Sequence, residues 1–128
     1  MEQLQVSLVA PETARLGSKV PITIRLRNSG DSPLELYLRG RTIAFDIVIA
    51  DAIGRVVWRR LEGEVVPGII QFKLLGAREA LDLSHDWDQR TNRGASVGPG
   101  EYTAQGILLT DGPEPITSAL TPFRIVPD

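Results

Sequence analysis

The sequence predicts an all-β fold, an antiparallel β-sandwich of about seven to nine strands in a single domain over residues 1–128. The main observation is a hydrophobic period of two, because apolar and polar side chains alternate along most of the chain. A second observation is that turn-forming residues separate these segments at intervals of about eight to twelve residues. The third is length, since 128 residues suffice for one core and fall short of two at about 150 residues per domain.

Six segments show the alternation and are predicted to be half-buried strands. In the clearest of them Val20, Ile22, Ile24 and Leu26 alternate with polar neighbours. The six segments are 3–8, 19–28, 34–39, 45–49, 81–88 and 101–108, and residues 55–61 are predicted as a further strand that carries Trp58. No segment has the spacing of an amphipathic helix.

Turn signals fall between the predicted strands. Residues 28–33 combine Asn, Ser, Gly, Asp and Pro, each of which favours a turn for its own backbone reason. Residues 51–54 are typical of a tight hairpin connection. Residues 93–94 and 98–100 interrupt a longer loop, and 111–113 interrupt the last hairpin. Short strands joined in this way favour a sandwich.

Charge and composition exclude several classes of protein. The net charge is −2, so the basic footprint of a nucleic-acid-binding domain is missing. No apolar run approaches the roughly 18 residues of a membrane span, and no basic stretch followed by an apolar one suggests a signal peptide. With zero Cys there is no disulfide, thiolate metal site or cysteine nucleophile. A cysteine-free β domain suits a reducing compartment, and we expect a cytoplasmic protein.

The run Ser84-His85-Asp86 has the residue types of a catalytic triad, but strand geometry argues against one. Neighbours on a strand face opposite sides, so His85 would point away from the other two. His85 is the only histidine, which removes most acid–base and zinc schemes. We therefore predict no catalytic residues, no cofactor and no small-molecule substrate.

An acidic cluster offers a possible calcium site. Asp82, Asp86, Asp88 and Asn92 supply oxygen ligands, which calcium requires in sets of six to eight. Their spacing does not match the Asp-x-Asp-x-Asp-Gly calcium loop, and a solvated strand face explains them more simply. We predict that no metal is bound.

Two features make the predicted sandwich more specific. Gly100-Glu101-Tyr102 opens a strand after a Pro-Gly turn, as in a tyrosine corner, where the phenol hydroxyl bonds to the backbone upstream. Trp58 is placed to be the central buried tryptophan of an immunoglobulin-like domain, in one core with Phe45, Trp87 and Tyr102. The alternative is that these aromatic residues only fill the core of another type of sandwich.

Taken together, one stretch resembles the bacterial intracellular proteinase inhibitor family. The resemblance covers about residues 20 to 110 and rests on a phenylalanine-led strand, a Gly-x-x-Val-Trp strand, a Trp-Asp loop and a Pro-Gly-x-Tyr strand. The residues that carry this signature are Phe45, Trp58, Trp87, Asp88, Gly94, Gly100 and Tyr102. The Trp-Asp to Pro-Gly-x-Tyr part is also similar to the immunoglobulin-like domain of the flagellar hook-capping protein. The first resemblance implies an immunoglobulin-like sandwich and inhibition of intracellular serine proteases, but it supplies no inhibitory residues.

The segment in which this chain departs from that family is our candidate for the protease contact. Val65 and Val66 are β-branched and favour extended angles, Pro67 biases Val66 the same way, and Gly63 and Gly68 bracket the segment with turns. The predicted contact loop is Glu62, Gly63, Glu64, Val65, Val66, Pro67 and Gly68. The alternative contact is the loop that carries Arg90 and Arg93, which would suit a trypsin-like pocket.

The predicted partner is therefore a protein, a serine protease in the first hypothesis, with no nucleic acid and no membrane. In the second hypothesis the chain is a non-inhibitory scaffolding module that pairs with another protein through a sheet face or an edge strand.

Overall fold

The computed structural model describes residues 3–40 and 42–128 and confirms the immunoglobulin-like, all-β sandwich. None of these residues is helical. A helix long and apolar enough to cross a membrane is accordingly not found in the part of the chain described. The strands are β1 (Leu4–Val9), β2 (Thr13–Arg15), β3 (Val20–Asn28), β4 (Leu34–Arg39), β5 (Phe45–Asp51), β6 (Val56–Arg59), β7 (Ile70–Leu75), β8 (Ala80–Trp87), β9 (Gly100–Leu108), β10 (Ile116–Thr117) and β11 (Thr121–Val126).

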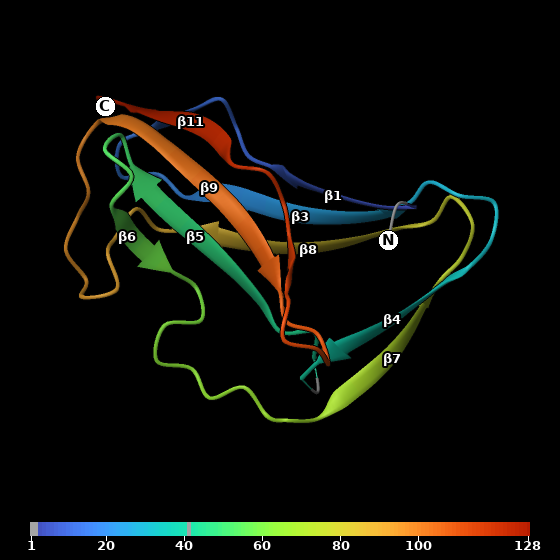
Figure 1. Ribbon diagram of the computed structural model, residues 1–128. Helices are drawn as coiled ribbons and strands as arrows, with labels where there is room; N and C mark the ends of the chain where they lie inside the picture. Colours follow the sequence, from blue (N-terminus) through green and yellow to red (C-terminus); the bar gives the residue numbers. More distant parts are fainter. Residues whose placement is uncertain (1–2, 41) are drawn as a thin grey trace.

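Two sheets form the sandwich. One has the order β1-β3-β8, and the other has the order β2-β11-β9-β5-β6 with β10 added to β9 (Figure 1). All pairings are antiparallel except β2 with β11, which is parallel. The strands exceed the predicted seven to nine because β2, β7 and β10 carry no clear apolar-in, polar-out pattern in the sequence.

The core lies between the two sheets and follows the predicted alternation. Along β3 every second residue from Val20 to Asn28 is buried, and along β9 the same holds from Tyr102 to Leu108. The sheets are in close contact at Gly106, where a Cβ atom would lie 2.6 Å from the Ile24 side chain. A glycine is required there because any side chain would push the sheets apart.

The aromatic residues cluster in this core, with one correction to the prediction. Trp87 is fully buried, and its ring centroid lies 6.2 Å from those of Tyr102 and Phe123. Trp58 is only partly buried: it packs against the edge of the cluster, 6.0 Å from Trp87, because β6 is the last strand of its sheet. The central buried tryptophan is therefore Trp87 rather than Trp58.

The tyrosine corner is confirmed. The Tyr102 hydroxyl donates a hydrogen bond of 2.6 Å to the backbone oxygen of Gly98, four residues upstream. Gly100, between them, has a φ of +147°, which is within the range that favours glycine.

Strands β4 and β7 form a separate two-stranded sheet that projects from one end of the sandwich (Figure 1). Their register pairs Leu34 with Leu75 and Arg39 with Ile70. The inner face carries the buried Leu36 and Leu38, and the Arg39 amide joins this sheet to the sandwich by donating to the Leu109 oxygen at 3.0 Å.

Candidate functional site

The segment between β6 and β7 contains the predicted contact loop, Glu62–Gly68. It begins with a turn in which the Glu64 amide donates to the Leu61 oxygen at 3.0 Å, and Gly63 has a φ of +76°. The buried Asp46 carboxylate fixes the start of the turn by accepting from the Leu61 amide at 2.9 Å. Both turn signals predicted for this segment, at Gly63 and Gly68, fall on a turn and a bend of the backbone.

The middle of the contact loop is presented to solvent. Val65 is 92% exposed, the highest value among the exposed large apolar side chains of the described residues. Val66 is half-buried and Pro67 is exposed. At the far end, the Ile69 oxygen accepts from the Gly40 amide at 2.7 Å, so both ends of the loop are tied to neighbouring backbone. An apolar side chain is thus held on a segment anchored at both ends.

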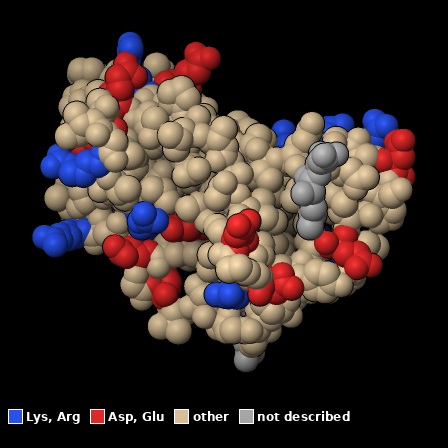
Figure 2. Space-filling view, in the orientation of Figure 1, with Lys and Arg blue, Asp and Glu red and all other residues tan. Residues whose placement is uncertain are grey.

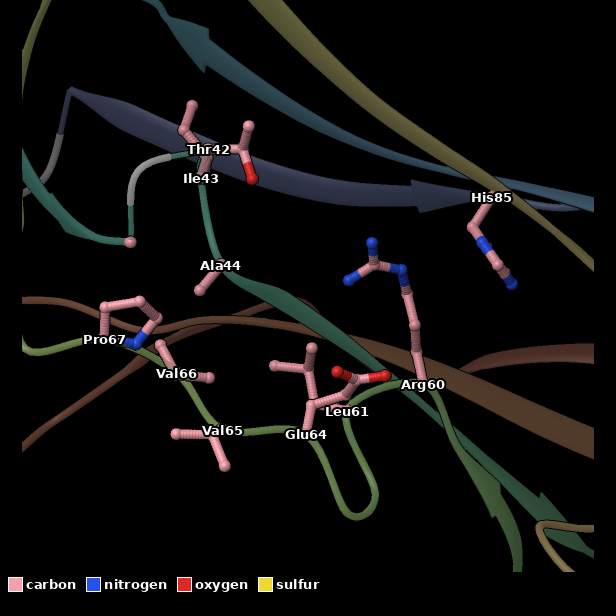
Figure 3. A pocket seen from close by; sticks show the side chains of 11 residues that line it. Thr42, Ile43, Ala44, Arg60, Leu61, Glu64, Val65, Val66, Pro67 and His85 are labelled. Carbon is pink, nitrogen blue, oxygen red and sulfur yellow. The ribbon is translucent and has the colours of Figure 1, made fainter.

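A cavity of about 380 Å³ lies beneath this loop (Figure 3). It is open to solvent on one side and has mixed walls. These are formed by residues 40 and 42–44, by the contact loop and the adjoining Leu61, and by the side chains of Arg60 and His85. The lining residues are Gly40, Thr42, Ile43, Ala44, Arg60, Leu61, Glu64, Val65, Val66, Pro67 and His85. Figure 3 shows Arg60 and His85 pointing into the same space from two different strand regions.

Arg60 is held on the floor of the cavity by Phe45. Its guanidinium lies 3.8 Å above the Phe45 ring centroid, and Nη1 donates to the Phe45 oxygen at 2.7 Å. Burial lowers the pKa of Arg60 from its ordinary value, while the charges of Asp46 and Glu64 act in the opposite direction. The cation is retained because its face stacks on an aromatic ring and one edge is hydrogen-bonded.

His85 occupies the inner wall. Its ring stacks on Trp58 with centroids 5.6 Å apart. Burial, followed by the positive charge of Arg60, lowers the pKa of His85 below the ordinary value of 6.5. The neighbouring Ser84 faces the opposite side, where its hydroxyl lies 2.8 Å from that of Thr23. His85 therefore lies on the face opposite to Ser84 and Asp86, as predicted.

Three of the four residues considered for calcium, Asp82, Asp88 and Asn92, are bonded to other parts of the protein. Asp82 forms an ion pair with Arg25 at 2.8 Å, and Asp88 accepts from the Arg90 amide at 3.2 Å. Asn92 accepts from the Arg59 amide at 2.8 Å and donates to its oxygen at 2.9 Å. Across residues 3–40 and 42–128, no three His, Cys, Asp or Glu side chains are grouped so that they could hold a metal.

The alternative contact loop, between β8 and β9, is braced by a buried side chain that the sequence interpretation missed. Gln89 is 2% exposed and has a φ of +62°. Its side-chain oxygen accepts from the Gly17 amide at 3.0 Å, and its amide nitrogen donates to the oxygens of Arg15 and Ser18, both at 2.8 Å. No local signal marks this residue, because its partners lie more than 70 residues away in the sequence.

The two arginines of this loop have different surroundings. Arg90 is fixed, since Nη1 donates to the Gly94 oxygen at 3.1 Å and its own oxygen accepts from the Trp87 indole at 3.0 Å. Arg93 is exposed at the tip, beside Gly94 with a φ of +87°. Its guanidinium has no ion pair within the described part of the chain. Both residues are exposed, and they differ in that the Arg90 guanidinium is bonded to the loop backbone.

The charged side chains on one face of the molecule are of mixed sign. Figure 2 shows Lys and Arg scattered among Asp and Glu on the face in view, with no continuous area of one sign. The fold is that of an immunoglobulin-like domain, and both of these loops connect strands of that domain.

The chain belongs to the BsuPI family of intracellular proteinase inhibitors, which matches residues 8–112. This match confirms the resemblance found in the sequence, and the family is one of inhibitors rather than enzymes. No curated protein sequence matches the chain significantly.

Solved structures share the fold at low sequence identity. The alkylpurine DNA glycosylase AlkC of Pseudomonas fluorescens is 14% identical, with a TM-score of 0.52 over 96% of this chain and 30% of the glycosylase chain. The CARDB domain of a Pyrococcus furiosus protein is 11% identical, with a TM-score of 0.48 over 96% of this chain and 87% of that one. A β-glucosidase of Erythrobacter marinus is 19% identical, with a TM-score of 0.49 over 96% of this chain and 16% of the enzyme. The chain thus spans less than a third of the glycosylase, and that likeness concerns the fold alone.

Proposed function

We propose that this chain, as a single domain over residues 1–128, inhibits a serine protease in the cytoplasm by binding it non-covalently through a loop of the sandwich. The observation that carries the proposal is membership of a family of intracellular proteinase inhibitors. The absence of cysteine agrees with a reducing compartment.

The contact loop that we propose is Glu62–Gly68. A protease cleft requires an exposed side chain on a segment whose backbone is already ordered, because ordering on binding costs affinity. Val65 supplies the exposed apolar side chain, and the anchors at Leu61 and Ile69 limit the motion of the segment. Val66, which is half-buried and lines the cavity, is the less accessible of the two valines.

The Arg93 loop is the competing contact, and its bracing by Gln89 and Asn92 is the observation in its favour. The two loops predict different targets. Val65 fits an apolar pocket of a subtilisin-like protease, whereas Arg93 fits the acidic pocket of a trypsin-like protease.

The test is inhibition of purified subtilisin-like and trypsin-like proteases by the purified chain. If Glu62–Gly68 is the contact, Val65→Asp weakens inhibition by at least about 100-fold, as expected for a central interface residue. Ile53→Asp is the matched control, because Ile53 is 82% exposed at the tip of another hairpin. Val66 is left unchanged because substitution of a half-buried residue would also lower stability.

The same assay with Arg93→Ala tests the competing loop, with the exposed Arg27→Ala on β3 as its control. Loss of inhibition in Arg93→Ala but not in Val65→Asp would assign the contact to the β8–β9 loop. A wild-type chain that inhibits no protease of either type would refute the proposed function and leave the non-inhibitory scaffolding module.

A further inference from the structure

The outward face of the β4–β7 sheet carries a concentration of exposed apolar side chains. Tyr37 is 45% exposed, Ile70 40%, Phe72 54% and Leu74 52%. These are four of the ten large apolar side chains that remain exposed in the described part of the chain. Tyr37 and Phe72 are direct cross-strand partners, with ring centroids 5.5 Å apart. An apolar area of this kind, gathered on one sheet face, marks an interaction surface.

The face has charges of opposite sign at its two ends. Side chains alternate along a strand, so Glu35 and Arg39 lie on the same face as Tyr37. The register pairs Glu35 with Leu74 at one end and Arg39 with Ile70 at the other. Neither Glu35 nor Arg39 has an ion-pair partner within the described residues. The Glu35 carboxylate accepts a hydrogen bond of 3.2 Å from the Tyr37 hydroxyl, and Arg39 is half-buried with its Nε unbonded among these residues.

We propose that this face is a dimer interface, on which two copies of the chain pack face to face about a two-fold axis that runs across the strands. Such an axis reverses the strand direction of the second copy and keeps β4 over β4. Glu35 of one copy then lies over Arg39 of the partner subunit. By the same symmetry, Arg39 of the first copy lies over Glu35 of the partner subunit. Tyr37 and Phe72 each meet their own counterparts at the centre, as an isologous interface requires.

The positions of the charges favour a second copy of the chain as the partner, related by a two-fold axis across the strands. A two-fold axis along the strands would place each charge over an apolar side chain, namely Glu35 over Leu74 and Arg39 over Ile70. Desolvation of those unpaired charges would oppose association. The surface therefore matches a copy of itself turned end over end, since each end charge meets its opposite and the apolar centre meets an apolar centre.

The geometry of aligned sheets permits these contacts. Glu35 and Arg39 are four residues apart, so each lies about 7 Å from the central pair along the strand. The rotation of about 30° between packed sheets displaces the ends by only about 3.5 Å. Glutamate and arginine side chains are long enough to span that displacement.

The expected affinity is low. The four large side chains are each about half exposed. Dimerisation would therefore bury on the order of 400 Å² of apolar surface per copy, or about 800 Å² for the pair, without the surrounding polar residues. That area lies at the small end of specific interfaces, so we expect a dissociation constant in the micromolar range.

The test is analytical ultracentrifugation of the chain at low salt, from about 5 to 500 μM, a range that brackets the expected constant. Phe72→Lys, at the centre of the face, abolishes the dimer. Leu120→Lys, at an apolar residue outside the face that is more exposed than Phe72, leaves the dimer unchanged. A wild-type chain that stays monomeric at the highest concentration, or a dimer unaffected by Phe72→Lys, overturns the proposal.

The charge pairing is tested by two single variants and their mixture. In E35R and in R39E alone, both ends of the homodimer carry like charges, and the dissociation constant rises about tenfold or more. When the two variants are mixed, each new charge meets its opposite on the other chain, and a heterodimer of near wild-type affinity forms. Melting temperatures and circular dichroism confirm that each variant is folded. If folded single variants lose affinity and their mixture does not recover it, the end-over-end arrangement is wrong.

Discussion

Gln89 allows a quantitative test of how the β8–β9 loop is held. Its buried side chain forms three hydrogen bonds of 2.8 to 3.0 Å to the backbone of residues 15–18. A hydrogen bond contributes about 1 kcal/mol net, and buried backbone groups left without a partner cost as much or more. We therefore expect Gln89→Ala to lower the free energy of unfolding by about 3 kcal/mol.

The backbone of Gln89 supplies an internal control. Its φ of +62° is unfavourable by about 1 kcal/mol for any residue with a Cβ atom. Gln89→Gly loses the same hydrogen bonds but relieves this strain, so we expect it to be about 1 kcal/mol more stable than Gln89→Ala. Gln5→Ala, at an exposed glutamine on β1, controls for the loss of an amide side chain in general.

The measurement is urea-induced unfolding at 25 °C, followed by tryptophan fluorescence. For a chain of this size, a loss of about 3 kcal/mol also lowers the melting temperature by about 10 °C. A loss below about 1 kcal/mol in Gln89→Ala would show that water replaces the three bonds at little cost, and it would refute the argument that this side chain braces the loop.

Three further predictions concern the core and its pH dependence. In urea unfolding, Trp87→Ala should lower the free energy of unfolding by about 3–5 kcal/mol. Trp58→Ala should lower it by about half as much, because Trp58 is only partly buried, and equal losses would contradict this reasoning. Tyr102→Phe should cost about 1–2 kcal/mol through loss of the bond to Gly98, and an unchanged stability would show that the corner is dispensable. Burial and the charge of Arg60 lower the pKa of His85 in the folded chain, so His85 binds a proton more readily in the unfolded chain than in the folded one. The free energy of unfolding should therefore be constant above pH 7 and fall as the pH drops through 6.5. His85→Gln should remove this fall in the free energy of unfolding below pH 6.5. If the fall persists in the variant, other titrating groups cause it.

The alternation of side chains was sufficient to predict the sandwich, because its two sheets each bury one face. Every second residue of β3 and β9 is buried, so the sequence pattern and the burial pattern coincide. Trp58 shows the limit of this reasoning. Alternation places it on an inner face, but its burial depends on β6 being the last strand of the sheet, and strand order is a property of the whole fold.

Strand β7 was not predicted, for a related physical reason. Its apolar residues Ile70 and Phe72 point to solvent, and Lys73 faces inward and is half-buried. Such a strand does not follow the rule that apolar residues point to the core, because Ile70, Phe72 and Leu74 stay exposed among the described residues. The same deviation that concealed the strand identifies the face as an interaction surface.

The candidate site was predictable in its loops but not in its supports. The Gly63 turn follows from local sequence, whereas the cavity beneath Val65 brings together residues from β8, from the end of β6 and from the segment before β5. Packing between segments far apart in sequence creates this cavity, and no spacing along the chain reports it.

Strand β6 connects the two candidate contact loops. Asn92, in the β8–β9 loop, is bonded to both the amide and the oxygen of Arg59, the last residue of β6. The next residue, Arg60, forms the floor of the cavity under Glu62–Gly68, and the following amide, of Leu61, is held by Asp46. Both loops therefore depend on the same few residues at the end of one edge strand. A substitution at Asn92 would loosen either loop without touching a bound protease, so assignment of the contact requires exposed side chains such as Val65 and Arg93, whose removal leaves these supports intact.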